Sequence, residues 1–247
     1  MIRIVIYLLF VASACASEAI PEKPLERFKI EIPKSPLKNQ APTITVIIAN
    51  VGFTPKTEER IRVLNSDVVI AFADYEKIIP SATSMAMTSG HQLLVTLVVP
   101  APMEGLNNSI LFQDTADAER LAPWKKLGAP VKGFLLSYGY YGDEKTLRPT
   151  LEYAAKENFL VVFPEPHINA DKICAETKTN CLVGHFLITQ KDDEIMVKKK
   201  LEMAENMSKT IGHATITIHV NDSLFDEVLK WLESLKAKNI NLKKLVD

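Results

Sequence analysis

Glycine is scarce in this sequence, with nine among 247 residues, and no G-x-G-x-x-G motif follows a predicted strand. Dinucleotide-binding folds need those glycines for the turn that holds the pyrophosphate, so that class is disfavoured. No G-x-S-x-G motif occurs either, and the usual nucleophile turn of serine hydrolases is therefore missing. Net charge is also nearly absent at −1, so we expect no nucleic acid as a partner.

Long hydrophobic runs are missing except at the N-terminus, where the run is too short to span a membrane. Arg3 precedes apolar residues 4–11, and small residues follow at 12–16, which predicts a secretory signal peptide over residues 1–16. Two processing routes remain open: cleavage after the triplet ACA, or lipidation of Cys15 in the loose lipobox ASAC. We expect an exported protein of the periplasm or cell envelope, which contacts a membrane only if Cys15 is lipidated.

Cysteine is also rare, and export explains how the three residues are used. Once Cys15 is removed or lipidated, only Cys174 and Cys181 remain, and they flank the polar loop CAETKTNC. In an oxidising compartment this pair predicts a disulfide bond, and a pair of metal ligands is the less favoured interpretation.

The rest of the chain divides into two parts. Residues 17–43 contain five prolines and mixed charges, which predicts an extended tether. Residues 44–247 alternate β-branched apolar runs with amphipathic stretches, which predicts an α/β domain with a parallel sheet. The expected strands are Ile44–Ile48, Val68–Phe72, Leu93–Val98, Val131–Leu136, Phe159–Phe163, Gly184–Ile188 and Ala214–His219.

In a parallel α/β fold the functional face lies beyond the carboxyl ends of the strands. In this chain those positions carry mostly Ala, Thr, Ser, Val or Tyr. Hydrolysis at a metal needs three or four converging His, Asp or Glu ligands, and general acid–base chemistry needs a carboxylate or imidazole. The strand ends offer few of these groups.

The order of several short segments resembles the divergent polysaccharide deacetylase family, exported relatives of the NodB-like carbohydrate deacetylases. The segments are IIANVG, VVIAFADY, SGHQLLVTLVVPAP, GFLLSYGY and ITIHVND, and the similarity covers about residues 42–238. The resemblance implies a distorted seven-stranded parallel (β/α) barrel. It also implies a protein of carbohydrate metabolism in the cell envelope.

The departures from the family pattern fall on its chemistry. Two aspartates of the first strand are replaced by Ala49 and Asn50, and histidines of the third and fourth strands by Thr96 and Ser137. The aspartate that ends the sixth strand is replaced by Ile188. The last family histidine falls near Val220, with His219 one place away. We therefore expect a catalytically inactive member of the family that holds no metal cofactor.

The strand ends could still form a ligand groove. Tyr138, Tyr140 and Tyr141 follow the fourth strand, and aromatic faces can stack on sugar rings, although ordinary loop packing also explains them. We expect the partner to be an envelope glycan or an envelope protein. The expected lining consists of these tyrosines and of Asn50, Asp74, Glu165, His167 and His219.

Two alternatives stay open. An active metal-dependent deacetylase could have rebuilt a zinc site from Glu165, His167 and His219, with Asp222 nearby. Alternatively, the tether carries the function and the domain is a spacer. The remaining charged features are expected to be structural, and the run Lys198-Lys199-Lys200 is interpreted as a solvated helix face.

Overall fold

The computed structural model describes residues 41–51, 59–73, 80, 84–85, 88–97, 122, 124–127, 130–137 and 144–246. The predicted signal peptide and almost all of the predicted tether lie outside these residues. The boundaries predicted for those two segments therefore remain predictions.

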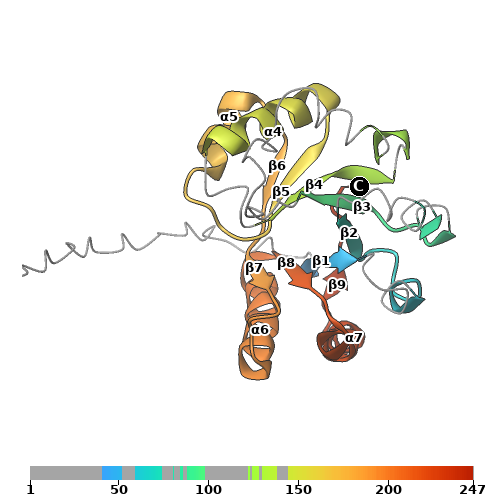
Figure 1. Cartoon of the computed structure of the whole chain (residues 1–247). Coiled ribbons are helices and arrows are strands. Elements are labelled where there is room, and N and C mark those ends of the chain that lie inside the picture. The colour runs from blue at the N-terminus through green and yellow to red at the C-terminus, as the bar shows by residue number, and fades with distance from the viewer. Residues whose placement is uncertain are drawn as a thin grey trace, which may run out of the picture. The chain divides into compact units, whose positions relative to one another are not determined.

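The described strands form one sheet in which every pairing is parallel. Their order is β6-β5-β4-β3-β2-β1-β8-β7, and β9 pairs with β1 (Figure 1). The sheet curls into a half-barrel, which confirms the α/β class with a parallel sheet that the alternation of strands and helices predicts. The strands are β1 (Thr43–Val51), β2 (Val69–Ala73), β3 (Leu93–Leu97), β4 (Val131–Leu136), β5 (Leu160–Phe163), β6 (Cys181–Val183), β7 (Phe186–Ile188), β8 (His213–His219) and β9 (Asn241–Leu242).

The described strands outnumber the expected seven because β6 and β9 were not predicted, whereas the sixth predicted strand, Gly184–Ile188, corresponds to β7. Gly184 and His185 connect β6 to β7. Gly184 N–H donates to the Phe163 carbonyl on β5 at 2.7 Å, whereas His185 N–H donates to the Thr215 carbonyl on β8 at 3.0 Å. One short segment thus passes from one edge of the sheet to the other. A Cβ at Gly184 would lie 2.5 Å from the Pro164 carbonyl oxygen, so this crossing requires glycine.

Four longer helices follow the strands of the second half: α4 (Glu144–Glu157), α5 (Ala170–Thr177), α6 (Glu194–Ile211) and α7 (Asp222–Ala237). Side chains at their ends explain where α6 and α7 begin. Asp193 accepts the Met196 N–H at 2.8 Å, and Asn221 accepts the Leu224 N–H at 2.9 Å. Helix α6 ends at Gly212, whose φ of 89° is the left-handed conformation that glycine adopts without strain.

The two faces of the sheet have different cores. The larger core packs the sheet against helices and includes Leu147 of α4, Val197 of α6 and Leu224 of α7. The smaller core contains sheet residues only, so it lies on the concave face. Its buried members are Ile47, Ala49, Val69, Ala71, Leu94, Leu135, Leu160 and Val162.

The C-terminal segment closes the amino-terminal end of the curled sheet. Strand β9 pairs with the start of β1, and Leu245 then packs against the smaller core. Gln92 holds this segment, because its Oε1 accepts the N–H groups of Leu245 at 2.9 Å and Val246 at 3.1 Å. Its Nε2 also donates to the Val246 carbonyl.

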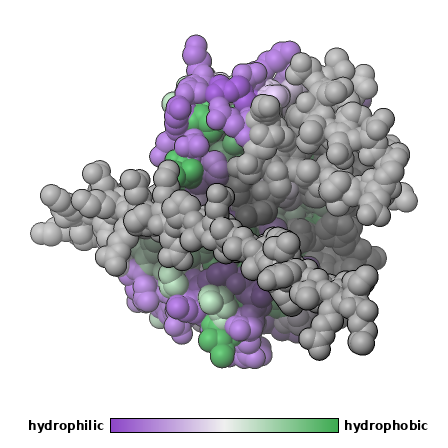
Figure 2. All heavy atoms as spheres, turned by 60° about the vertical axis from the view of Figure 1, so that its left-hand side comes forward, coloured by the Kyte–Doolittle hydropathy of each residue, from purple (hydrophilic) through white to green (hydrophobic). Residues whose placement is uncertain are grey.

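The predicted disulfide bond is confirmed: Cys174 of α5 is joined to Cys181 of β6. Among the described helices, none combines the length and the apolar composition that crossing a bilayer would require. On the face drawn in Figure 2, the described residues are mostly hydrophilic, with a few small hydrophobic patches between them.

Candidate functional site

Of the family positions at the carboxyl ends of the strands, Ala49 and Thr96 lie on the concave face, whereas Ile188 belongs to the larger core. Ala49 is the last residue of β1 that belongs to the smaller core on the concave face, and it is the register partner of His219 on β8. Thr96 of β3 pairs with Ala73 and with Leu135, which belongs to the inner core. Register partners in a sheet share a face, so His219 and Thr96 both point to the inside of the curl.

The side chains in these positions are neutral. Ala49 is fully buried, and Thr96 is 2% exposed, with no hydrogen-bond partner for its hydroxyl among the described residues. Thr217, two residues before His219, is likewise buried, and its hydroxyl has no described partner. Ser137 lies just after β4, and its N–H donates to the Leu97 carbonyl at 3.1 Å. Ala49, Thr96, Thr217 and His219 therefore give this part of the concave face hydroxyl groups and an imidazole.

A pocket of about 500 Å³ opens where β5 and β7 separate at their carboxyl ends. β6 pairs with β5, and β7 pairs with β8, so β5 and β7 are not joined by backbone hydrogen bonds. This leaves the space between their carboxyl ends open. We call it the central pocket. Its lining residues are Leu136, Pro164, Glu165, Leu187, Thr189, Gln190, Lys191, Lys200 and His219.

Two of the predicted groove residues, Glu165 and His219, line this central pocket together. Burial lowers the pKa of His219, so its imidazole is neutral at pH 7. A neutral imidazole can donate one hydrogen bond and accept another. Together with the Glu165 carboxylate and the cationic Lys191, it provides polar groups suited to a ligand rich in hydroxyl groups.

His167 does not join this pair. Its ring stacks on Phe163 with 5.7 Å between the ring centroids, and it is absent from the lining of the central pocket. Within the described part of the chain, no three His, Cys, Asp or Glu side chains are close enough to hold a metal ion. The donor set of these residues does not fit the zinc site that the deacetylase resemblance implies.

Asp74, Tyr138, Tyr140 and Tyr141 lie outside the described residues, and only the backbone of Asn50 is described. The sugar-stacking role of the tyrosines stays a prediction.

The structure adds lining residues that sequence reasoning did not select. Thr189 and Gln190 directly follow the predicted sixth strand, and that position was the available signal. Lys200 was interpreted as part of a solvated helix face, and for this residue the interpretation is wrong. Its Nζ donates to the Leu187 carbonyl and to the Asp192 carboxylate, both at 2.7 Å, so it covers the unpaired edge of β7.

Comparison with models of protein families identifies the family of this chain. The model of the divergent polysaccharide deacetylase family matches residues 46–246. The chain belongs to this family. No curated protein matches the chain.

Two solved structures share the fold of this deacetylase family member. An uncharacterized protein from Agrobacterium tumefaciens is 16% identical, with a TM-score of 0.69 over 84% of this chain and 89% of that one. A protein from Enterococcus faecalis, proposed to cleave cellobiose phosphate, is 12% identical, with a TM-score of 0.56 over 83% of this chain and 98% of that one. At these identities the similarity establishes the fold only.

Proposed function

We propose that this divergent polysaccharide deacetylase is an exported, catalytically inactive member of its family that binds an envelope glycan in the central pocket. One observation carries the proposal. The inner positions at the carboxyl ends of β1 and β3 hold Ala49 and Thr96, where the family resemblance expects metal-binding and catalytic groups. A methyl group and a hydroxyl cannot replace a carboxylate and an imidazole as zinc ligands.

The pocket itself favours binding of a sugar. Its volume of about 500 Å³ falls in the range of small-molecule sites, and its lining combines apolar Leu136, Pro164 and Leu187 with polar groups. Such a surface can contact the C–H face of a sugar ring while Glu165 and His219 bond its hydroxyl groups. The three tyrosines after β4 are proposed to extend this surface.

The test combines three measurements on the purified protein: zinc content, acetate release from an N-acetylglucosamine tetramer, and calorimetric binding of that tetramer. We expect no stoichiometric zinc, no acetate and measurable binding. Stoichiometric zinc together with acetate release would favour the alternative of an active enzyme, and no binding would reject the glycan proposal.

Variants locate the binding site. Glu165→Gln replaces a charged acceptor by a neutral one and should weaken tetramer binding about tenfold, since a hydrogen bond to a charged group contributes about 1 to 1.5 kcal/mol more than one to a neutral group. Glu233→Gln, at an exposed position of α7 outside the pocket lining, is the matched control and should bind like the parent. Separate alanine variants of Tyr138, Tyr140 and Tyr141 test the stacking, which is rejected if all three keep the parent affinity.

A further inference from the structure

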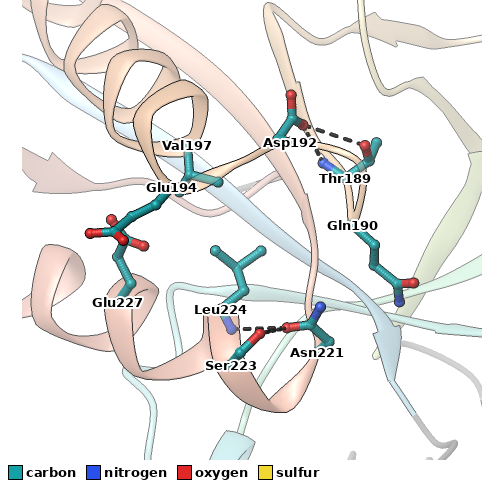
Figure 3. Close-up of a pocket in the computed structure, with 9 residues that line it drawn as sticks. All are labelled: Thr189, Gln190, Asp192, Glu194, Val197, Asn221, Ser223, Leu224 and Glu227. Atoms are coloured by element: carbon teal, nitrogen blue, oxygen red, sulfur yellow. Dashed lines mark hydrogen bonds between the residues drawn. The ribbon is translucent and has the colours of Figure 1, made fainter.

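A second cavity, of about 360 Å³, lies between the starts of α6 and α7 (Figure 3). We call it the outer cavity. Thr189 and Gln190 line both this cavity and the central pocket, so the two spaces lie on either side of one turn. A ligand longer than one sugar unit could therefore occupy both.

Hydrogen bonds and an ion pair fix the conformation of the turn between the two cavities, residues 189–192. The Asp192 carboxylate accepts the Thr189 N–H at 2.7 Å and the Lys200 ammonium at 2.7 Å. Lys200 also binds the Leu187 carbonyl, which ties the turn to β7. The backbone of this turn is thus fixed before a ligand binds, and the side chain of Gln190 extends from it (Figure 3).

Three carboxylates line the outer cavity: two of them form salt bridges, and Lys198 also interacts electrostatically with the third, Glu227. Asp192 is paired with Lys200, and Glu194 is paired with Lys198 at 2.5 Å. The third, Glu227 of α7, points toward Glu194 in Figure 3. Its Oε1 is buried and has no hydrogen-bond partner among the described residues.

A buried carboxylate oxygen without a donor is unfavourable, and a ligand that brings an N–H or O–H group relieves this cost. A cationic donor gains most, because hydrogen bonds to ionised groups are the stronger ones. Ser223, on the same helix as Glu227, and Asn221 just before that helix bond each other, with 2.8 Å between the hydroxyl and the amide oxygen. They present neutral polar groups to the same ligand.

We propose that the outer cavity is a second binding site for the same ligand. It takes the next unit of a glycan chain bound in the central pocket, and it selects a unit that carries a free amino group, which Glu227 binds. This inference rests on the proposed function, because the first unit must occupy the central pocket.

The experiment compares two probes by calorimetry with the full chain: a tetramer of glucosamine and a tetramer of N-acetylglucosamine. We expect the parent to bind the glucosamine tetramer about tenfold more tightly. Glu227→Gln should remove this preference and leave the affinity for the N-acetylated tetramer unchanged within about twofold. Glu233→Gln on the same helix is the matched control and should retain the preference. Thermal unfolding of each variant verifies that it is folded.

The outcomes separate the two proposals. If both tetramers bind but Glu227→Gln changes neither affinity, the outer site is refuted and glycan binding in the central pocket stands. An equal affinity of the parent for the two tetramers likewise refutes selection of an amino group. If neither tetramer binds, the proposed function fails and the outer site fails with it.

Discussion

The imidazole of His213 should make the folded state sensitive to acid. It lies at the start of β8, where Nδ1 is 2.9 Å from the Thr43 hydroxyl and Nε2 is 3.1 Å from the Thr215 hydroxyl. Burial, followed by the positive charge of Lys243 and the nearby His185, lowers its pKa from 6.5 to about 4. The folded protein therefore binds a proton at this ring less readily than the unfolded chain does.

The sign and size of the effect follow from this difference. Between pH 6.5 and about 4 the unfolded state binds more protons, so the free energy of unfolding falls as the pH falls through this window. Below about pH 4 this group contributes no further loss. The full difference corresponds to about 3 kcal/mol, and because the ring is only half-buried, solvent screening reduces the expected loss to about 1 to 2 kcal/mol.

Urea unfolding at pH 7.5 and at pH 4.5 measures this loss in the parent protein and in His213→Gln. The variant should be less stable at pH 7.5, since it loses hydrogen bonds, but its further loss at pH 4.5 should be smaller by about 1 to 2 kcal/mol. His167→Gln, outside the curled sheet, controls for removal of an imidazole. If parent and His213→Gln lose the same stability between the two pH values, the reasoning is refuted.

Three further perturbations test the fold. Gln92→Ala should lower the free energy of unfolding by about 1 to 3 kcal/mol, because it leaves two N–H groups of the C-terminal segment without their acceptor; an unchanged urea midpoint would contradict this. Replacing both Cys174 and Cys181 by Ser should cost about 2 to 3 kcal/mol for this short loop, and the parent under reducing conditions should match the double variant. Gly184→Ala should cost about 1 to 3 kcal/mol, since its Cβ would lie 2.5 Å from the Pro164 carbonyl oxygen; a melting temperature equal to that of the parent would show that the crossing can relax.

Much of the fold could be predicted because its signals are local. Runs of β-branched residues mark strands wherever they occur, and each of the seven expected strands overlaps an observed one. Gly212 ends α6 and Asn221 with Asp222 begins α7, since capping depends on a few neighbouring residues. The disulfide was predictable from loop length and expected compartment.

The candidate site was predicted only in part. Glu165 follows one predicted strand and His219 ends another, which made both predictable, and the curl then brings them to one pocket. His167 follows the same strand as Glu165 but turns to stack on Phe163, a choice made by packing that no local pattern reveals. The prediction that Lys200 is solvated was wrong because its binding partners, Leu187 and Asp192, lie outside its own helix, where helical periodicity gives no signal.

The sequence alone determined the alternation of strands and helices, the parallel class of the sheet and the neutral character of the strand ends, since composition and local periodicity encode all three. Tertiary structure decided that the chain crosses at Gly184 from one edge of the sheet to the other, that Leu245 packs against the smaller core, and that two cavities share the turn after β7. These features depend on how far the sheet curls. The curl arises from contacts between residues distant in the chain, which a local pattern does not contain.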